Sequence, residues 1–81
     1  TVSVDTIPPL IERIFTDSVA LHLILNEDSN CEYSNSTFSY GNGIQMTGID
    51  IKEHTAALQN RFYVICRDIY NNEMPQIIIR P

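Results

Sequence analysis

The sequence predicts an all-β domain, and three observations favour that class. Residues Val19–Leu25 alternate with the period of two that is typical of a strand. Residues Phe62–Cys66 combine aromatic and β-branched side chains, which strands favour. The composition has one lysine and many Asn, Ser, Thr and Ile residues, which suits a β-rich surface better than a helical bundle. Eighty-one residues are enough for one small domain.

The N-terminal residues divide into a short segment and the start of this domain. Thr1–Asp5 alternates, with Val2 and Val4 on one side of an extended chain. We therefore interpret residues 1–5 as a linker or an extra N-terminal strand, ahead of a single domain over residues 6–81. After two prolines, residues 10–15 fit either a helical face or a strand.

The segment Val19–Leu25 is the clearest strand. Its valine and three leucines share one face, and His22 lies on the other. The polar run over residues 26–30 predicts a turn, after which Cys31 opens the next strand.

A hairpin is predicted further along the chain. Residues 38–40 and 44–46 flank Asn42-Gly43, and an Asn-Gly pair between alternating residues is the strongest short hairpin signal. Residues 49–51 fit another short strand.

Residues 54–70 have two interpretations. Apolar side chains recur at helical spacing from Leu58 to Ile69, so a helix stays an open alternative. We prefer a strand over residues 62–67, because its side chains favour strands and turn residues follow it. A last strand over residues 76–80 has three isoleucines, followed by arginine and proline as at a sheet edge.

The two cysteines, Cys31 and Cys66, suggest a disulfide. The bond closes a loop of about 35 residues, worth roughly 4 kcal/mol in the chain-entropy model. It predicts an oxidising location, extracellular or at the cell surface. Two buried free thiols in a cytosolic protein are the alternative. A secreted protein needs a leader, so we expect a mature product or an excised segment.

The charge pattern excludes some partners. Five basic residues are scattered against ten acidic ones, for a net charge of −5. No basic stripe follows a phosphate backbone, so we expect no nucleic acid partner. No apolar run is long enough to span a membrane, so we expect no membrane insertion in this segment.

Several short motifs, in order, resemble one family. They are Asp5-Thr6-Ile7-Pro8-Pro9, the acidic run 26–30 before Cys31, Cys31-Glu32-Tyr33-Ser34, Phe38-Ser39-Tyr40, Met46-Thr47-Gly48 and Tyr63–Asn72 with its Cys-x-Asp. Together they are similar to fibronectin type III-like and immunoglobulin-like β-sandwich modules of bacterial and archaeal surface proteins. Asn71 stands where the family has Gly, Leu23 stands where many members have Trp, and residues 49–61 match poorly.

The resemblance implies a seven-stranded antiparallel β-sandwich with one disulfide. Cys31 and Cys66 would bridge neighbouring strands of one sheet. The implied core consists of Val19, Leu21, Leu23, Phe62, Val64 and Ile79.

Catalytic and metal sites are not indicated. His22 and His54 match no zinc spacing, and we interpret both as surface residues. The serines of residues 34–39 fit a solvated loop, so we expect no enzyme and no cofactor. Residues 68–73 offer oxygen ligands, but no calcium-loop spacing, and we expect no metal.

The remaining candidates are surfaces. Asn35-Ser36-Thr37 is an N-glycosylation sequon, with Asn35 as the acceptor. Tyr40 and Tyr70 are candidates for a glycan-binding platform. The candidate self-association strands comprise Val2, Val4, Ile77, Ile78 and Ile79.

The sequence therefore predicts a non-catalytic extracellular structural or adhesion module, whose partners are neighbouring domains or subunits of a cell-surface protein. One alternative is the self-assembling subunit of a filament or pilus, a homo-oligomer joined by strand addition. The other is a glycan-binding accessory module of a secreted enzyme.

Overall fold

The computed structural model describes residues 7–81 and confirms the all-β class. Its strands are β1 (Ile11–Thr16), β2 (Ala20–Ser34), β3 (Ile44–Gln45), β4 (Ile51–Ala57), β5 (Phe62–Asp68) and β6 (Ile77–Ile79). No helix occurs in the described range, so both helical alternatives are wrong. Six strands are seen there, against seven predicted, and all pairings between them are antiparallel. The seven-stranded sandwich stays a prediction.

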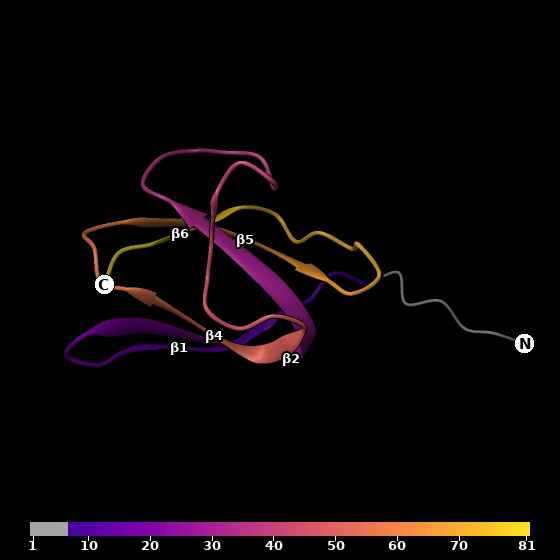
Figure 1. The fold of residues 1–81 in the computed structure, drawn as a ribbon, viewed down its shortest axis with the longest axis horizontal. Helices are drawn as coiled ribbons and strands as arrows, with labels where there is room; N and C mark the ends of the chain where they lie inside the picture. The colour runs from indigo at the N-terminus through magenta and orange to yellow at the C-terminus, as the bar shows by residue number, and fades with distance from the viewer. Residues whose placement is uncertain (1–6) are drawn as a thin grey trace, which may run out of the picture.

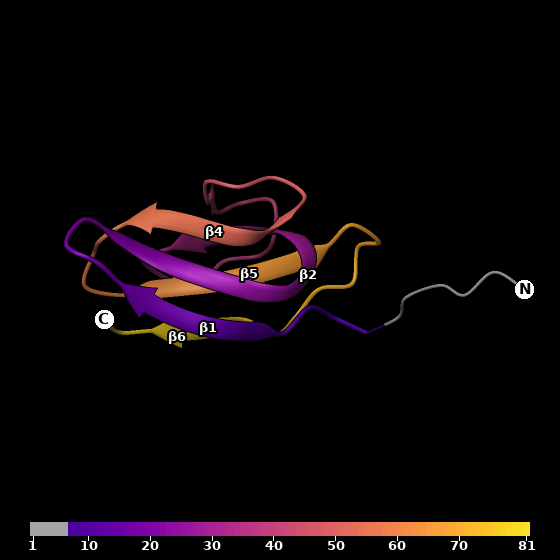
Figure 2. The same cartoon turned by 90° about the horizontal axis from the view of Figure 1, so that it is seen from below.

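One long strand, β2, organises the sheet. Its first half pairs with β1 and β4, and its second half pairs with β5 and β3. The sheet order is β1-β2-β5-β6, and β3 and β4 also pair with β2. Figure 1 shows β2 as the long strand that crosses the centre of the molecule. Because β2 curves, β4, its first half and β1 form one layer, and β5 and β6 lie behind them (Figure 2). The described residues thus form a single curled sheet.

The turn predicted at residues 26–30 is wrong, because β2 runs through it. The polar side chains there have partners that keep the strand extended. Asn26 exchanges hydrogen bonds with the backbone of Leu10, its N–H donating at 2.9 Å and its Oδ1 accepting at 2.9 Å. Ser29 is fully buried and takes part in the pairing with β5. Polar composition alone therefore does not end a strand whose polar groups are satisfied.

The core lies between the two layers. Leu21, Leu23 and Leu25 of β2 are fully buried, and they pack with residues of β5 and β6 that include Phe62. Val64 and Ile79 are also buried, so five of the six predicted core residues are confirmed. The prediction that the sixth residue, Val19, lies in the core is wrong, because Val19 is 71% exposed. It precedes β2, in a turn where the Asp17 carboxylate accepts its N–H at 2.8 Å.

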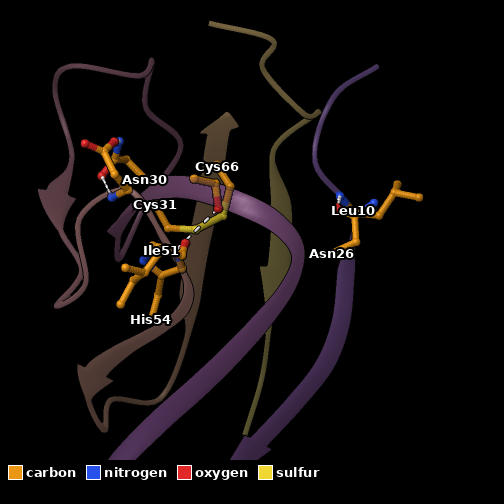
Figure 3. Close-up of a disulfide and its surroundings, with 9 residues drawn as sticks. Leu10, Asn26, Asn30, Cys31, Ile51, His54 and Cys66 are labelled. Atoms are coloured by element: carbon orange, nitrogen blue, oxygen red, sulfur yellow. Dashed lines mark hydrogen bonds between the residues drawn. A yellow bond between two sulfur atoms is a disulfide. The ribbon is translucent and has the colours of Figure 1, made fainter. Parts of the chain in front are cut away.

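A disulfide joins Cys31 and Cys66, as predicted. The two residues are directly opposite each other on β2 and β5, and both are fully buried. Figure 3 shows the bond between the curved part of β2 and β5. The alternative of free thiols is wrong, and the implied bridge between neighbouring strands of one sheet is confirmed.

The predicted hairpin of residues 38–46 is wrong in its pairing. The strand β3 pairs with Glu32 and Tyr33 of β2, and residues 38–40 form no strand. The glycine turn between them is held by the Glu32 carboxylate, whose Oε1 accepts the N–H groups of Gly41 at 2.7 Å and Gly43 at 3.1 Å. A long-range hydrogen bond therefore competes with the local turn signal.

The strand predicted at residues 49–51 begins later and is longer. Gly48 and Asp50 have positive φ angles of 111° and 54°, and this turn leads into β4 at Ile51. His54 lies within β4 and is fully buried, so its predicted surface position in a loop is wrong.

Candidate functional site

A polar cleft opens where the second half of β2 meets the turn after β5. Its volume is about 490 Å³. Eight residues line it: Asp28, Asn30, Tyr40, Asp50, Arg67, Asp68, Ile69 and Asn71. They come from β2, from β5 with its turn, and from the two loops on either side of β3. Curling of the sheet thus gathers side chains that are 40 residues apart in the sequence.

Arg67 is the cation of the cleft. Its guanidinium lies 4.1 Å from the centroid of the Tyr40 ring, a cation–π contact. Its Nη2 donates to Glu73 Oε1 at 2.8 Å. Burial, followed by the nearby Glu32 carboxylate, raises the pKa of Tyr40, so its hydroxyl stays protonated at neutral pH. Arg67 and Tyr40 therefore offer the cleft an oriented cation and a neutral hydroxyl.

One side of the cleft is fixed by a reciprocal pair. Asn30 Nδ2 donates to Asp50 Oδ1 at 2.8 Å, and the N–H of Asp50 donates to Asn30 Oδ1 at 3.0 Å. These bonds hold the turn before β4 against β2. The exposed carboxylate of Asp28 and the exposed amide of Asn71 complete the polar lining.

Asp68 has a structural role in the turn after β5. Its Oδ1 accepts the N–H groups of Tyr70 and Asn72, each at 2.8 Å, and its Oδ2 accepts Nδ2 of Asn72 at 2.8 Å. Burial opposes the charged form, but these hydrogen bonds outweigh it and lower the pKa of Asp68. Asp68 thus stays ionised with its oxygens directed at the turn.

A metal ion has no prepared site in the part of the chain that the structure describes. No group of three or more His, Cys, Asp and Glu side chains there is placed to hold one.

The cleft therefore combines carboxylates, amides, a guanidinium and an aromatic ring where β2 meets the turn after β5. Such a mixture offers both donors and acceptors to a ligand rich in hydroxyl groups. The predicted glycan-binding platform included Tyr40, and the predicted run of oxygen ligands at residues 68–73 included Asp68, whereas no site was predicted at Asn30, Asp50 or Arg67. Their contacts depend on the curl of β2, which no local pattern indicates.

The two histidines lie outside the cleft. His22 Nε2 is 2.7 Å from Asp17 Oδ2, and its ring stacks on Phe15 with centroids 4.6 Å apart. The hydrogen bond to Asp17 raises the pKa of His22. The buried His54 donates from Nε2 to the Ile51 carbonyl at 2.9 Å, and burial lowers its pKa.

The other predicted site residues lie on separate surfaces. Asn35 is exposed in the loop after β2, beside a hollow of about 330 Å³ that Gln59 and Arg61 also line. Ile77, Ile78 and Ile79 form β6. Val2 and Val4 lie outside the described residues.

An apolar groove separates β1 from β6. We call it the seam groove, and its volume is about 240 Å³. It is lined by Pro9, Leu10, Ile11, Ile14, Met74, Pro75 and Ile77.

The chain matches no family model, no curated protein and no solved structure. Over residues 7–81, no helix is long and apolar enough to cross a membrane.

Proposed function

We propose that the chain is a non-catalytic extracellular structural or adhesion module of a cell-surface protein. The observation that carries the proposal is the buried Cys31–Cys66 disulfide, which joins the central strand β2 to β5 in the core. A structural bond of this kind persists in oxidising compartments, and small extracellular domains depend on such bonds. The fibronectin type III-like resemblance supports the same class of protein.

The polar cleft is the proposed contact site of the adhesion module, and its ligand is a neutral oligosaccharide. Sugar hydroxyls both donate and accept, as the amides, carboxylates and guanidinium of the cleft do. The positive charge of Arg67 repels a cationic ligand, and the negative charges of the exposed Asp28 and Asp50 repel an anionic one. A glycan-binding accessory module of a secreted enzyme, which is the other alternative predicted from the sequence, would use the same cleft.

The test is retention of the intact, oxidised chain on immobilised neutral oligosaccharides. We expect Asp28→Ala and Tyr40→Ala to weaken retention at least tenfold, because each removes part of the cleft lining. Glu12→Ala is the matched control, since Glu12 is an exposed carboxylate on β1, outside the cleft. If the three variants are retained equally, or if the chain is retained on no oligosaccharide, the cleft does not have the proposed role.

A second candidate function is the self-assembling subunit of an extracellular filament. One observation favours it: the seam groove is apolar and lies between two strands, β1 and β6, that each have one neighbour among the described strands. Size-exclusion chromatography with light scattering on the oxidised chain distinguishes this function from a monomeric module.

A further inference from the structure

The sequon Asn35-Ser36-Thr37 is a motif that the proposed function leaves unused. No other asparagine of the chain has Ser or Thr at the second position after it. The structure places all three residues of the sequon on the surface, where each is exposed. An acceptor for N-glycosylation must be reachable in this way, on a surface loop of a secreted chain.

The segment that contains the sequon is fixed at both of its ends. The pairing of β2 with β5 stops at Ser34 and Tyr63, so the chain leaves the sheet just before the acceptor. The N–H of Ser36 donates to Ser34 Oγ at 3.4 Å. The N–H of Phe38 donates to Gln76 Oε1 at 3.1 Å. The exposed sequon therefore lies between two anchored points on a short bend.

The acceptor side chain forms one wall of a polar hollow of about 330 Å³. The other walls are Gln59, Asn60 and Arg61, which belong to the loop between β4 and β5. Arg61 Nη1 donates to the Tyr63 hydroxyl at 3.4 Å, which directs the guanidinium towards β5. The lining is thus three amides and one guanidinium. Amides donate and accept and a guanidinium donates, which suits the hydroxyl and acetamido groups of a sugar.

We propose that Asn35 carries an N-linked glycan whose first sugar occupies this hollow, against Gln59 and Arg61. A sugar tethered to one wall has a high local concentration at the others, so a few polar contacts are enough to hold it there. The proposal rests on the extracellular location in the proposed function, because the sequon is modified in secreted chains.

The attachment needs a donor of one chemical class, an oligosaccharide carried on a lipid diphosphate. The side-chain nitrogen Nδ2 of Asn35 forms a bond to C1 of the first sugar and loses one proton. The bond from C1 to the diphosphate oxygen breaks, and the lipid diphosphate leaves with the electron pair of that bond. No oxidation or reduction takes place.

A glycan at this position leaves the polar cleft open. The acceptor follows Ser34, which pairs near the start of β5, whereas Asp68 and Asn71 of the cleft lie at and beyond its end. The seven residues of β5 span roughly 23 Å. Figure 1 shows the loop between β4 and β5 at the end of the molecule that holds the C-terminus, and the turn after β5 at the opposite end. The bulky, hydrated glycan thus covers one end of the module while the other remains free for a ligand.

The first test is the attachment itself. The full chain, with an added leader, is secreted from eukaryotic cells, and its intact mass is measured before and after an amidase removes N-linked glycans. We expect the oxidised chain to carry a glycan, and Asn35→Gln and Thr37→Ala to be secreted without it. Ser36→Ala is the matched control, because it changes the sequon segment but keeps the sequon. Peptide mapping of the chain purified from the cells that make it should find the same site modified.

The second test is the position of the first sugar. An endoglycosidase that leaves only the first N-acetylglucosamine gives a sample for NMR, in which the acetamido methyl group should show nuclear Overhauser contacts to Gln59 and Arg61. Gln59→Ala with Arg61→Ala should keep the glycan and move the methyl resonance to its position in the unfolded chain. Gln45→Ala with Arg13→Ala is the matched control, since both residues are exposed outside the hollow, and it should leave the contacts in place.

The outcomes separate this proposal from the proposed function. A secreted, oxidised chain without a glycan overturns the proposal, and so does a first sugar that makes no contact with the hollow. If such a chain is still retained on immobilised oligosaccharides, the adhesion function stands. A chain that is purified from its own cells with reduced cysteines contradicts the extracellular location, and with it both proposals.

Discussion

The disulfide should contribute a large part of the stability of the domain. Cys31 and Cys66 are 35 residues apart. Removing the bond by Cys31→Ala with Cys66→Ala should lower the free energy of unfolding by about 4 kcal/mol, since the unfolded chain regains its loop entropy. A domain of this length has a total of about 4 to 12 kcal/mol. The double variant should therefore be marginally folded.

Urea unfolding followed by circular dichroism measures this loss. If the bond acts by restricting the unfolded chain, its removal should also raise the m value, because the free chain exposes more surface. Val64→Ala is the control. It removes buried apolar atoms from the same core and should lower the midpoint while leaving the m value unchanged. A double variant within about 1 kcal/mol of the unmodified chain would refute the reasoning.

Three further predictions test the turns and the buried polar groups. Gly48→Ala should destabilise by about 1 to 3 kcal/mol more than Gly41→Ala; both glycines have positive φ, but a Cβ at Gly48 would clash with the Glu53 carbonyl oxygen and one at Gly41 meets nothing, so equal urea midpoints would contradict the clash. Asp68→Ala should lower the free energy of unfolding by about 1 to 3 kcal/mol, because two N–H groups of the turn lose their acceptor. Amide hydrogen exchange in the turn should become faster, and an unchanged rate would contradict this role. Burial lowers the pKa of His54 below 6.5, so the unfolded chain takes up that proton first and the contribution of His54 to stability should fall as the pH drops below 6.5, while the raised pKa of His22 acts in the opposite direction; His54→Gln should therefore shift the slope of urea midpoints between pH 7.5 and 5 towards greater stability at low pH, and an unchanged slope would contradict the assignment.

Alternation and cysteine count predicted much of this fold. The strand around Leu21 and Leu23 and the strand from Phe62 follow from side-chain period, which is a local property of the sequence. The disulfide follows from the cysteine count, because two cysteines allow one intrachain pairing. The core outside Val19 was implied by the family resemblance, and the buried residues agree with the alternation in these strands.

The continuity of β2 could not be predicted, since the polar run that includes Asn26 and Ser29 has the composition of a turn. Only hydrogen bonds with distant residues keep it extended. The polar cleft was missed for the same reason. Asn30 and Asp50 are 20 residues apart, and nothing local in either segment marks the other as its partner.

The position of the disulfide in β2 has a mechanical consequence. The first and last strands, β1 and β6, lie outside the loop that Cys31 and Cys66 close, and β3 and β4 lie within it. When the chain is pulled from both ends, tension passes from β2 to β5 through the two sulfur atoms. Roughly 120 Å of chain is then shielded from extension. Under force, the outer strands of such a module extend and the extension then stops at the disulfide, so the module lengthens by a limited step.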